Sequence, residues 1–168
     1  MRIYASEIAG LLLDLFPEGE NGVVKCYRGT FPDLKSWITH GDLERVAVGS
    51  RVVMVEMLFP EISPVGEEVE GLSRQRYLLG VFCLERIAAD NVAPWQIREA
   101  LANFILSRVA PWCRKVRKHT GIPEKDFNIL TTSINSGRLD IAPEGLSEGW
   151  VAAGVSVEVI IAVKDIMV

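Results

Sequence analysis

The sequence predicts an α+β fold, in which a mostly antiparallel sheet is packed by one long amphipathic helix plus a short N-terminal helix. Three observations lead to this prediction. Val-rich runs with a two-residue alternation recur along the chain and predict strands. The segments between them are mostly rich in Gly, Pro and Glu, as hairpin connections are. One long stretch, residues 94–119, repeats its apolar residues every three or four positions and predicts the single helix that crosses the sheet.

The composition is that of one globular domain. The chain has 168 residues, which is enough to bury a core, and we expect a single domain over residues 1–168. Apolar residues make up 49% and charged residues 24%, so neither a disordered chain nor a fibrous repeat is indicated. The 22 acidic and 18 basic residues give a net charge of -4, which argues against a general role in coating nucleic acid.

The cysteines and the N-terminus indicate the compartment. Cys26, Cys83 and Cys113 are odd in number, widely spaced and without the C-x-x-C spacing of a zinc site or redox pair. We expect them to be reduced core thiols of a cytosolic protein. Polar and charged residues interrupt the N-terminal apolar run, which therefore suits neither a signal peptide nor a membrane span. The prediction is a cytoplasmic protein with no membrane partner.

The first elements in chain order are a helix and two strand regions. Apolar residues recur at helical spacing between Ser6, a candidate N-cap, and a stop at Pro17. Residues 23–28 have the composition of a strand. Residues 44–59 are expected to form either two strands with a tight turn near Gly49 or one bulged strand.

A charged connection and a buried strand follow. Residues 60–73 hold two Pro, two Gly and four Glu, which predicts a mobile acidic loop. Residues 74–88 are apolar on both faces over the centre of the run, as in a strand that lies inside a sheet. Because neighbouring strands usually pair, these residues and the preceding strand should form a long hairpin with the acidic loop at its tip.

The helix of residues 94–119 should begin with Pro94 at its first position and turn one apolar stripe to the core. Pro111 is expected to kink or divide this helix, because it lacks a backbone donor and clashes with the preceding turn. Residues 126–134 and 138–142 then predict a small hairpin with a Gly turn between them.

The final strand, residues 150–163, has two unlike faces. One face consists of Val, Ile and Ala and should pack on the helix and core. The other carries Ala152, Gly154, Ser156 and Glu158, and its small residues would let a second layer approach closely. That layer is another subunit in one interpretation; in the other, this is the solvent side of an ordinary sheet.

The sequence contains no G-x-G-x-x-G, no Walker loop and no H-E-x-x-H motif. The two histidines are His40 and His119. Cys113 and His119 are six residues apart on one predicted helix, which puts them on different faces and argues against a thiol–imidazole pair. We therefore expect no catalytic residue, no metal site, no cofactor and no enzymatic activity.

Two charged clusters are candidates for an interface, one acidic in the predicted loop and one basic at the end of the long helix. The basic cluster could bind a phosphate backbone, or it could meet the acidic loop of a neighbouring subunit and keep the copies in register. Cations at a helix C-terminus are also favoured by the helix dipole alone. With the small-residue face, the candidate interface residues are Glu61, Glu67, Glu68, Glu70, Arg114, Lys115, Arg117, Lys118, Ala152, Gly154, Ser156 and Glu158.

The order of elements resembles that of bacteriophage tail terminator proteins of Mu-like and lambda-like phages and prophages. The elements that carry the resemblance are the short N-terminal helix, RVVMVEMLF before Pro60, the acidic loop, the strand RQRYLLGVFCLERI, the amphipathic helix and WVAAGVSVEVIIAV. The resemblance covers most of the chain and is a pattern of elements without a signature motif. No functional residue is therefore carried over from the family.

The resemblance implies a structural protein that forms a hexameric ring on the last ring of the tail tube. Such a ring would stop tube polymerisation and present the surface to which the filled head attaches. Its partners would be copies of itself, tail-tube and head-connector proteins, and DNA that passes through the lumen without specific binding. An acidic lining around Glu158 or Glu56 would keep the DNA from sticking.

Two other function classes stay open at this point. A small-molecule-binding module would require a pocket with convergent polar groups, which the sequence does not indicate. A nucleic-acid-binding accessory protein would use the basic cluster at the end of the long helix.

Overall fold

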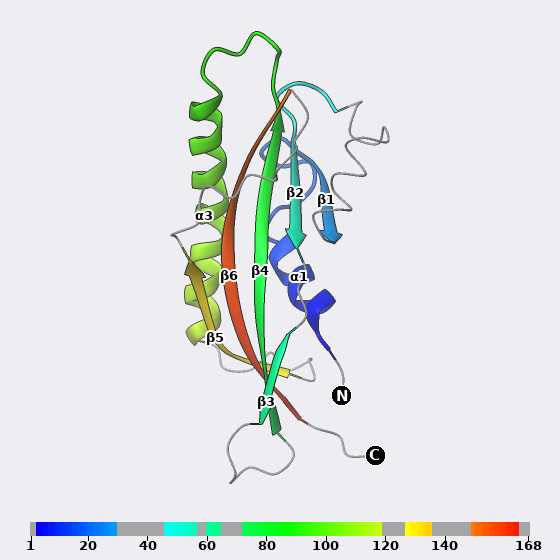
Figure 1. The fold of residues 1–168 in the computed structure, drawn as a ribbon, viewed down its shortest axis with the longest axis vertical. Coiled ribbons are helices and arrows are strands. Elements are labelled where there is room, and N and C mark those ends of the chain that lie inside the picture. Colours follow the sequence, from blue (N-terminus) through cyan, green and yellow to red (C-terminus); the bar gives the residue numbers. More distant parts are fainter. Residues whose placement is uncertain are drawn as a thin grey trace.

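The computed structural model of the chain describes residues 3–29, 46–56, 60–64, 72–118, 127–135 and 149–164. Within them, two helices lie against one mixed sheet, and the predicted α+β class is confirmed (Figure 1). The elements are α1 Ala5–Leu13, β1 Val23–Gly29, β2 Arg51–Glu56, β3 Glu61–Pro64, β4 Leu72–Arg86, α3 Pro94–Lys118, β5 Phe127–Asn135 and β6 Trp150–Lys164.

The sheet is built around the long strands β4 and β6. The strand order is β1-β2-β4-β6-β5, and β3 pairs with β4 as well. All pairs are antiparallel except β1 with β2. β2 and β3 follow one another along the same edge of β4, which confirms the predicted long hairpin. The predicted loop of residues 60–73 is too long, because Glu61–Pro64 is strand β3; residues 65–71, which join it to β4, lie outside the described residues.

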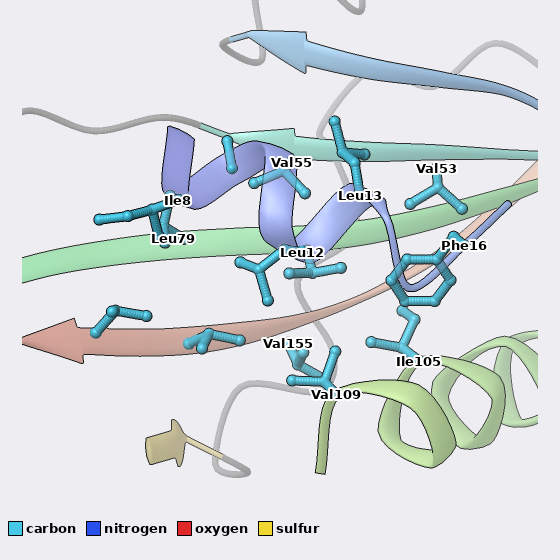
Figure 2. Packing of buried hydrophobic residues seen from close by; sticks show 14 of the residues in the cluster. Ile8, Leu12, Leu13, Phe16, Val53, Val55, Leu79, Ile105, Val109 and Val155 are labelled. Carbon is cyan, nitrogen blue, oxygen red and sulfur yellow. The ribbon is translucent and has the colours of Figure 1, made fainter. Parts of the chain in front are cut away.

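The first face of the sheet carries both helices. Alternate side chains of β2, β4 and β6 point to this face and are buried together with one side of each helix. Figure 2 shows Leu12 of α1 and Ile105 of α3 directed into the same apolar layer as Val53 and Val155. Burying one such side chain typically contributes about 1.5–3 kcal/mol, so this layer is the main source of stability. The predicted packing of the apolar face of β6 on the helix is confirmed.

The second face of the sheet has a smaller apolar cluster at the β2 end. Its buried members are Val52, Met54, Phe82, Leu84, Trp150 and Ala152. Towards β3 the same face becomes polar. The sheet is thus apolar on both faces over one half of its length only.

The start of α1 differs from the sequence prediction. The helix begins at Ala5, and Tyr4 occupies the N-cap position without a side-chain cap. Ser6 lies in the first turn, where its Oγ accepts a hydrogen bond of 3.2 Å from Arg28. The Tyr4 N–H donates to the Tyr77 hydroxyl at 2.8 Å, and the Tyr77 hydroxyl donates to Gln75 Oε1. A contact between elements far apart in sequence therefore fixes the helix start in place of a local cap.

α3 begins at Pro94, as predicted, and continues through Pro111 to Lys118. The predicted division of the helix at Pro111 is wrong. Val109 and Cys113 are buried on either side of the proline, and the Thr132 hydroxyl of β5 donates to the Cys113 carbonyl at 3.2 Å. Packing on both sides of Pro111 holds the helix on the sheet despite the missing backbone donor.

The two other strand predictions are resolved in part. Residues 46–50 precede β2 as a turn, in which Gly49 has a φ of +87° and its N–H donates to the Arg86 carbonyl. Neither the two-strand nor the bulged-strand prediction for residues 44–59 is therefore right. The first strand of the predicted small hairpin is β5, whereas residues 136–148, with the predicted turn and second strand, lie outside the described residues.

Candidate functional site

The cysteines lie in places that suit structure better than chemistry. All three are free thiols, and Cys83 and Cys113 are buried. Burial raises the pKa of Cys83 to about 12. Burial, followed by the charge of Glu18, raises the pKa of Cys26 to about 11. Both thiols are protonated at neutral pH, and a protonated thiol is a poor nucleophile.

An ion-paired cluster lies on the second face of the sheet, across β3, β4 and β6. Arg76 Nε donates to Glu158 Oε2 at 2.7 Å, and Arg76 Nη1 donates to Glu61 Oε2 at 3.1 Å. The hydrogen bond to Glu158, and then the one to Glu61, raises the pKa of the Arg76 guanidinium above its ordinary value. Two of the predicted interface residues are therefore brought together by an arginine that the sequence analysis did not single out.

This cluster changes the predicted character of Glu158. Its carboxylate is engaged by a cation of its own sheet, so it does not present an isolated negative charge to the second face. The signal that leads to Arg76 is its register, opposite Ile160 in β6 and Glu61 in β3. That register becomes known only when the strands are paired.

The small-residue face of β6 is largely covered within the chain. Ala152, Gly154 and Ser156 are buried, and Ala152 belongs to the second apolar cluster. Phe82 of β4 lies opposite Gly154, and its ring folds over Gly80, where a Cβ would lie only 2.5 Å from the ring. The small residues thus give room to a side chain of the same sheet. Contact of this face with another subunit stays a prediction.

The basic cluster is exposed where its side chains are described, at Arg114 and Lys115. Arg117 and Lys118 belong to the last turn of α3, with side chains outside the described set. Of the predicted acidic loop, Glu67, Glu68 and Glu70 also lie outside the described residues, as do His40 and His119.

A groove of about 400 Å³ lies between the end of α1 and the second half of α3. We call it the helix groove. Its wall combines two cations and one carboxylate with an apolar surface that includes an indole ring. It is lined by Asp14, Leu15, Pro17, Ser107, Arg108, Pro111, Trp112 and Lys115.

Exposed apolar side chains gather at the end of the molecule where β4 leaves the sheet. Val92 is 96% exposed and Trp95 63% exposed, both between the end of β4 and the first turn of α3. Val48, 64% exposed, lies in the turn that hydrogen-bonds to Arg86 at this same end (Figure 1). The exposed apolar groups at this end of the molecule are a candidate interaction surface.

No protein-family model and no curated protein matches the chain. Neither of the helices in the described residues has the length and apolar character needed to cross a membrane. The described residues also contain no group of three or more His, Cys, Asp or Glu side chains placed to hold a metal ion.

Proposed function

We propose that the chain is a structural phage or prophage tail protein that caps the tail tube as a ring and forms the head–tail joining surface. The observation that carries the proposal is the placement of two surfaces suited to assembly at opposite ends of an elongated sheet. Val92 and Trp95 are exposed at one end, and the β3–β4 hairpin extends past the helices at the other (Figure 1). A ring protein stacked between a tube and a head needs a contact surface at each end.

The function then follows from geometry rather than from bond chemistry. Copies of the chain, six in the proposed ring, would pack side by side and enclose a channel. DNA would cross this channel without sequence readout. The ion pairs of Arg76 with Glu61 and Glu158 partly neutralise these side chains on the second face near the hairpin. This part of the face would therefore bind neither cations nor anions strongly. Assembly would take place in the cytoplasm, and the finished ring would belong to the virion tail.

The first test is the mass of the purified protein in solution, by light scattering after size exclusion over a tenfold range of concentration. We expect a ring of about six subunits. The second test adds the protein to polymerising tail-tube protein of the same phage or prophage, and we expect tubes to stop growing. A protein that stays monomeric and leaves tube growth unchanged would overturn the proposal.

A matched pair of variants tests whether the exposed apolar end of the molecule is needed for capping. Trp95→Glu removes an exposed aromatic from the end of the molecule and should abolish capping while the fold is kept. Leu130→Glu changes a large exposed residue in the middle of β5 and serves as its control. Equal loss of capping in both variants would remove the end surface as the explanation.

A nucleic-acid-binding accessory function is the second candidate, and the exposure of Arg114 and Lys115 favours it. Binding through phosphate contacts weakens steeply with salt. Arg114→Glu combined with Arg117→Glu should then abolish DNA binding in a filter or anisotropy assay. No measurable binding of the unaltered protein at low salt would remove this candidate.

A further inference from the structure

We infer that the helix groove binds the acidic segment of residues 65–71 from a second copy of the chain. The inference rests on the proposed ring function and deepens it, because it names a contact that would hold neighbouring subunits in register. The groove itself is formed entirely by described residues of α3 and of the turn after α1.

Charge complementarity is the first argument. From Arg108 to the end of α3 the sequence has five basic residues and no acidic one, and two of the five, Arg108 and Lys115, line the groove. Residues 65–71, VGEEVEG, have three Glu and no basic residue. Complementary charge across an interface selects the partner and its register, and excludes partners of the wrong sign.

The apolar part of the groove fits the same segment. Trp112 and Leu15 offer apolar surface, and the segment contains Val65 and Val69 beside its Glu residues. The Ser107 hydroxyl donates to the Phe104 carbonyl at 2.7 Å and is thus engaged within its own helix. Recognition of an anion in the groove therefore depends on Arg108 and Lys115.

The segment must come from a second copy, because its attachment point on β4 lies too far along the sheet from the α1 end of the groove. The α1 end of the groove flanks Phe16, which lies beside Val53 (Figure 2), and Val53 pairs with Cys83 of β4. The segment is tethered where Pro64 pairs with Ser73, ten residues from Cys83. Ten strand residues span about 34 Å. Half of a seven-residue connection reaches at most about 12 Å, so the segment of the same chain cannot extend to the α1 end of the groove.

The test uses charge reversal on each side of the contact. One variant reverses the segment, Glu67→Lys, Glu68→Lys and Glu70→Lys, and another reverses the groove, Arg108→Glu and Lys115→Glu. Each alone should weaken self-association about tenfold or more, because like charges would meet. An equal mixture of the two variants should associate again. The reversed, basic segment of the first fits the reversed, acidic groove of the second, and the unaltered acidic segment of the second fits the unaltered basic groove of the first.

Controls keep the result interpretable. Arg98→Glu reverses an exposed charge on α3 outside the groove and should leave association unchanged. Lys115→Glu alone changes only an exposed side chain, and it replaces the double groove variant if Arg108→Glu impairs folding, as circular dichroism would reveal. Failure of the mixture to associate, when each variant is folded, overturns the contact.

A second measurement does not depend on ring formation. A fluorescent peptide of residues 61–74 is titrated with the unaltered protein, the groove variant and Arg98→Glu, and anisotropy is recorded. We expect saturable binding that the groove variant loses and Arg98→Glu keeps. Binding that is equal in all three, or a groove that takes a DNA oligonucleotide and not the peptide, overturns the inference.

The outcomes separate this inference from the proposed function. A ring that persists in every charge-reversal variant contradicts the contact and leaves the ring proposal standing. A protein that never forms a ring but binds the peptide through the groove supports the contact and contradicts the ring.

Discussion

The two halves of the β4–β6 pair share a buried first face and differ in their second face. At the β2 end the second face is apolar, with Phe82 and Leu84 buried. At the β3 end it carries Arg76 paired with Glu61 and Glu158, all partly or largely exposed. Exposed ion pairs contribute little to stability, so the β3 end is held by backbone pairing and by its first face alone. One half of a continuous sheet thus serves as core, and the other has a polar surface available to partners.

The difference between the two halves can be tested most directly by truncating one leucine in each half. Leu84 and Leu78 lie on the same face of β4, Leu84 fully buried and Leu78 41% exposed. Leu84→Ala should reduce the free energy of unfolding by about 2–5 kcal/mol, because it leaves a cavity. Leu78→Ala should change it by less than about 1 kcal/mol. Urea unfolding measures both, and similar losses would show that the two halves do not differ as described.

Gly80 marks the boundary between the halves. A Cβ at this position would meet the Phe82 ring at 2.5 Å, so Gly80→Ala should overpack the second face and cost about 1–3 kcal/mol. Gly80→Ala combined with Phe82→Leu should cost less than the sum of the two single changes. Gly10→Ala in α1, where the nearest neighbour is the flexible Arg28 side chain at 3.4 Å, is the control and should be neutral or stabilising. Additive losses would contradict the clash.

Alkaline pH should weaken the apolar half through Cys83. Its folded-state pKa of about 12 lies above the ordinary thiol pKa of 9.0, so the folded protein retains the proton to higher pH than the unfolded chain does. The corresponding stability is complete below pH 9, and it is lost as pH rises towards 12. Cys83 alone should lower the free energy of unfolding by about 1 kcal/mol between about pH 8 and about pH 10.

Cys83→Ala provides the comparison for this pH effect. The variant should be less stable at neutral pH and should lose less stability on the alkaline side. The remaining slope belongs largely to Cys26, whose pKa is raised to about 11, and to Tyr77, whose pKa burial also raises. Urea unfolding at several pH values checks the slopes, and identical slopes for both proteins would contradict the role of Cys83.

The smallest effect is expected at the ionic end. Arg76→Gln removes the cation between Glu61 and Glu158, and these solvent-exposed ion pairs are screened by salt. We expect an unchanged unfolding midpoint at physiological salt and a slightly lower one at low salt, where the two carboxylates repel each other. A loss as large as that of Leu84→Ala would mean that the β3 end depends on its ion pairs.

Local patterns predicted the elements that a single stretch of sequence determines. The alternation in β6 identified its buried face, and Pro94 marked the start of α3. Features that depend on distant partners were missed. The N-cap was placed at Ser6 because a hydroxyl is a common cap, whereas the Tyr77 hydroxyl, 73 residues away, receives the Tyr4 N–H. The parallel pairing of β1 with β2 could not be predicted either, because the alternation of apolar and polar residues is the same in parallel and antiparallel strands.

The candidate surfaces also include features that local sequence predicts and features that depend on distant residues. The charged clusters could be read from composition, but Arg76 could not be identified as the partner of Glu158 until β4 and β6 were in register. The helix groove is formed by the end of α1 and the second half of α3, which are about 90 residues apart in sequence. Periodicity within either helix indicates which side faces the core, and it does not indicate that their outer sides meet.

The pairing of β4 with β6, unbroken from Leu72 opposite Lys164 to Arg86 opposite Trp150, has a consequence for biosynthesis. The nearest partners in this pair are 64 residues apart in sequence and the farthest 92. On the ribosome, the backbone edge of β4 that pairs with β6 therefore stays unpaired until β6 has been translated. Such long-range pairing is slow, and a bare strand edge invites pairing with other chains. During this interval nascent chains are open to misassembly, and chaperone binding at β4 would shorten it.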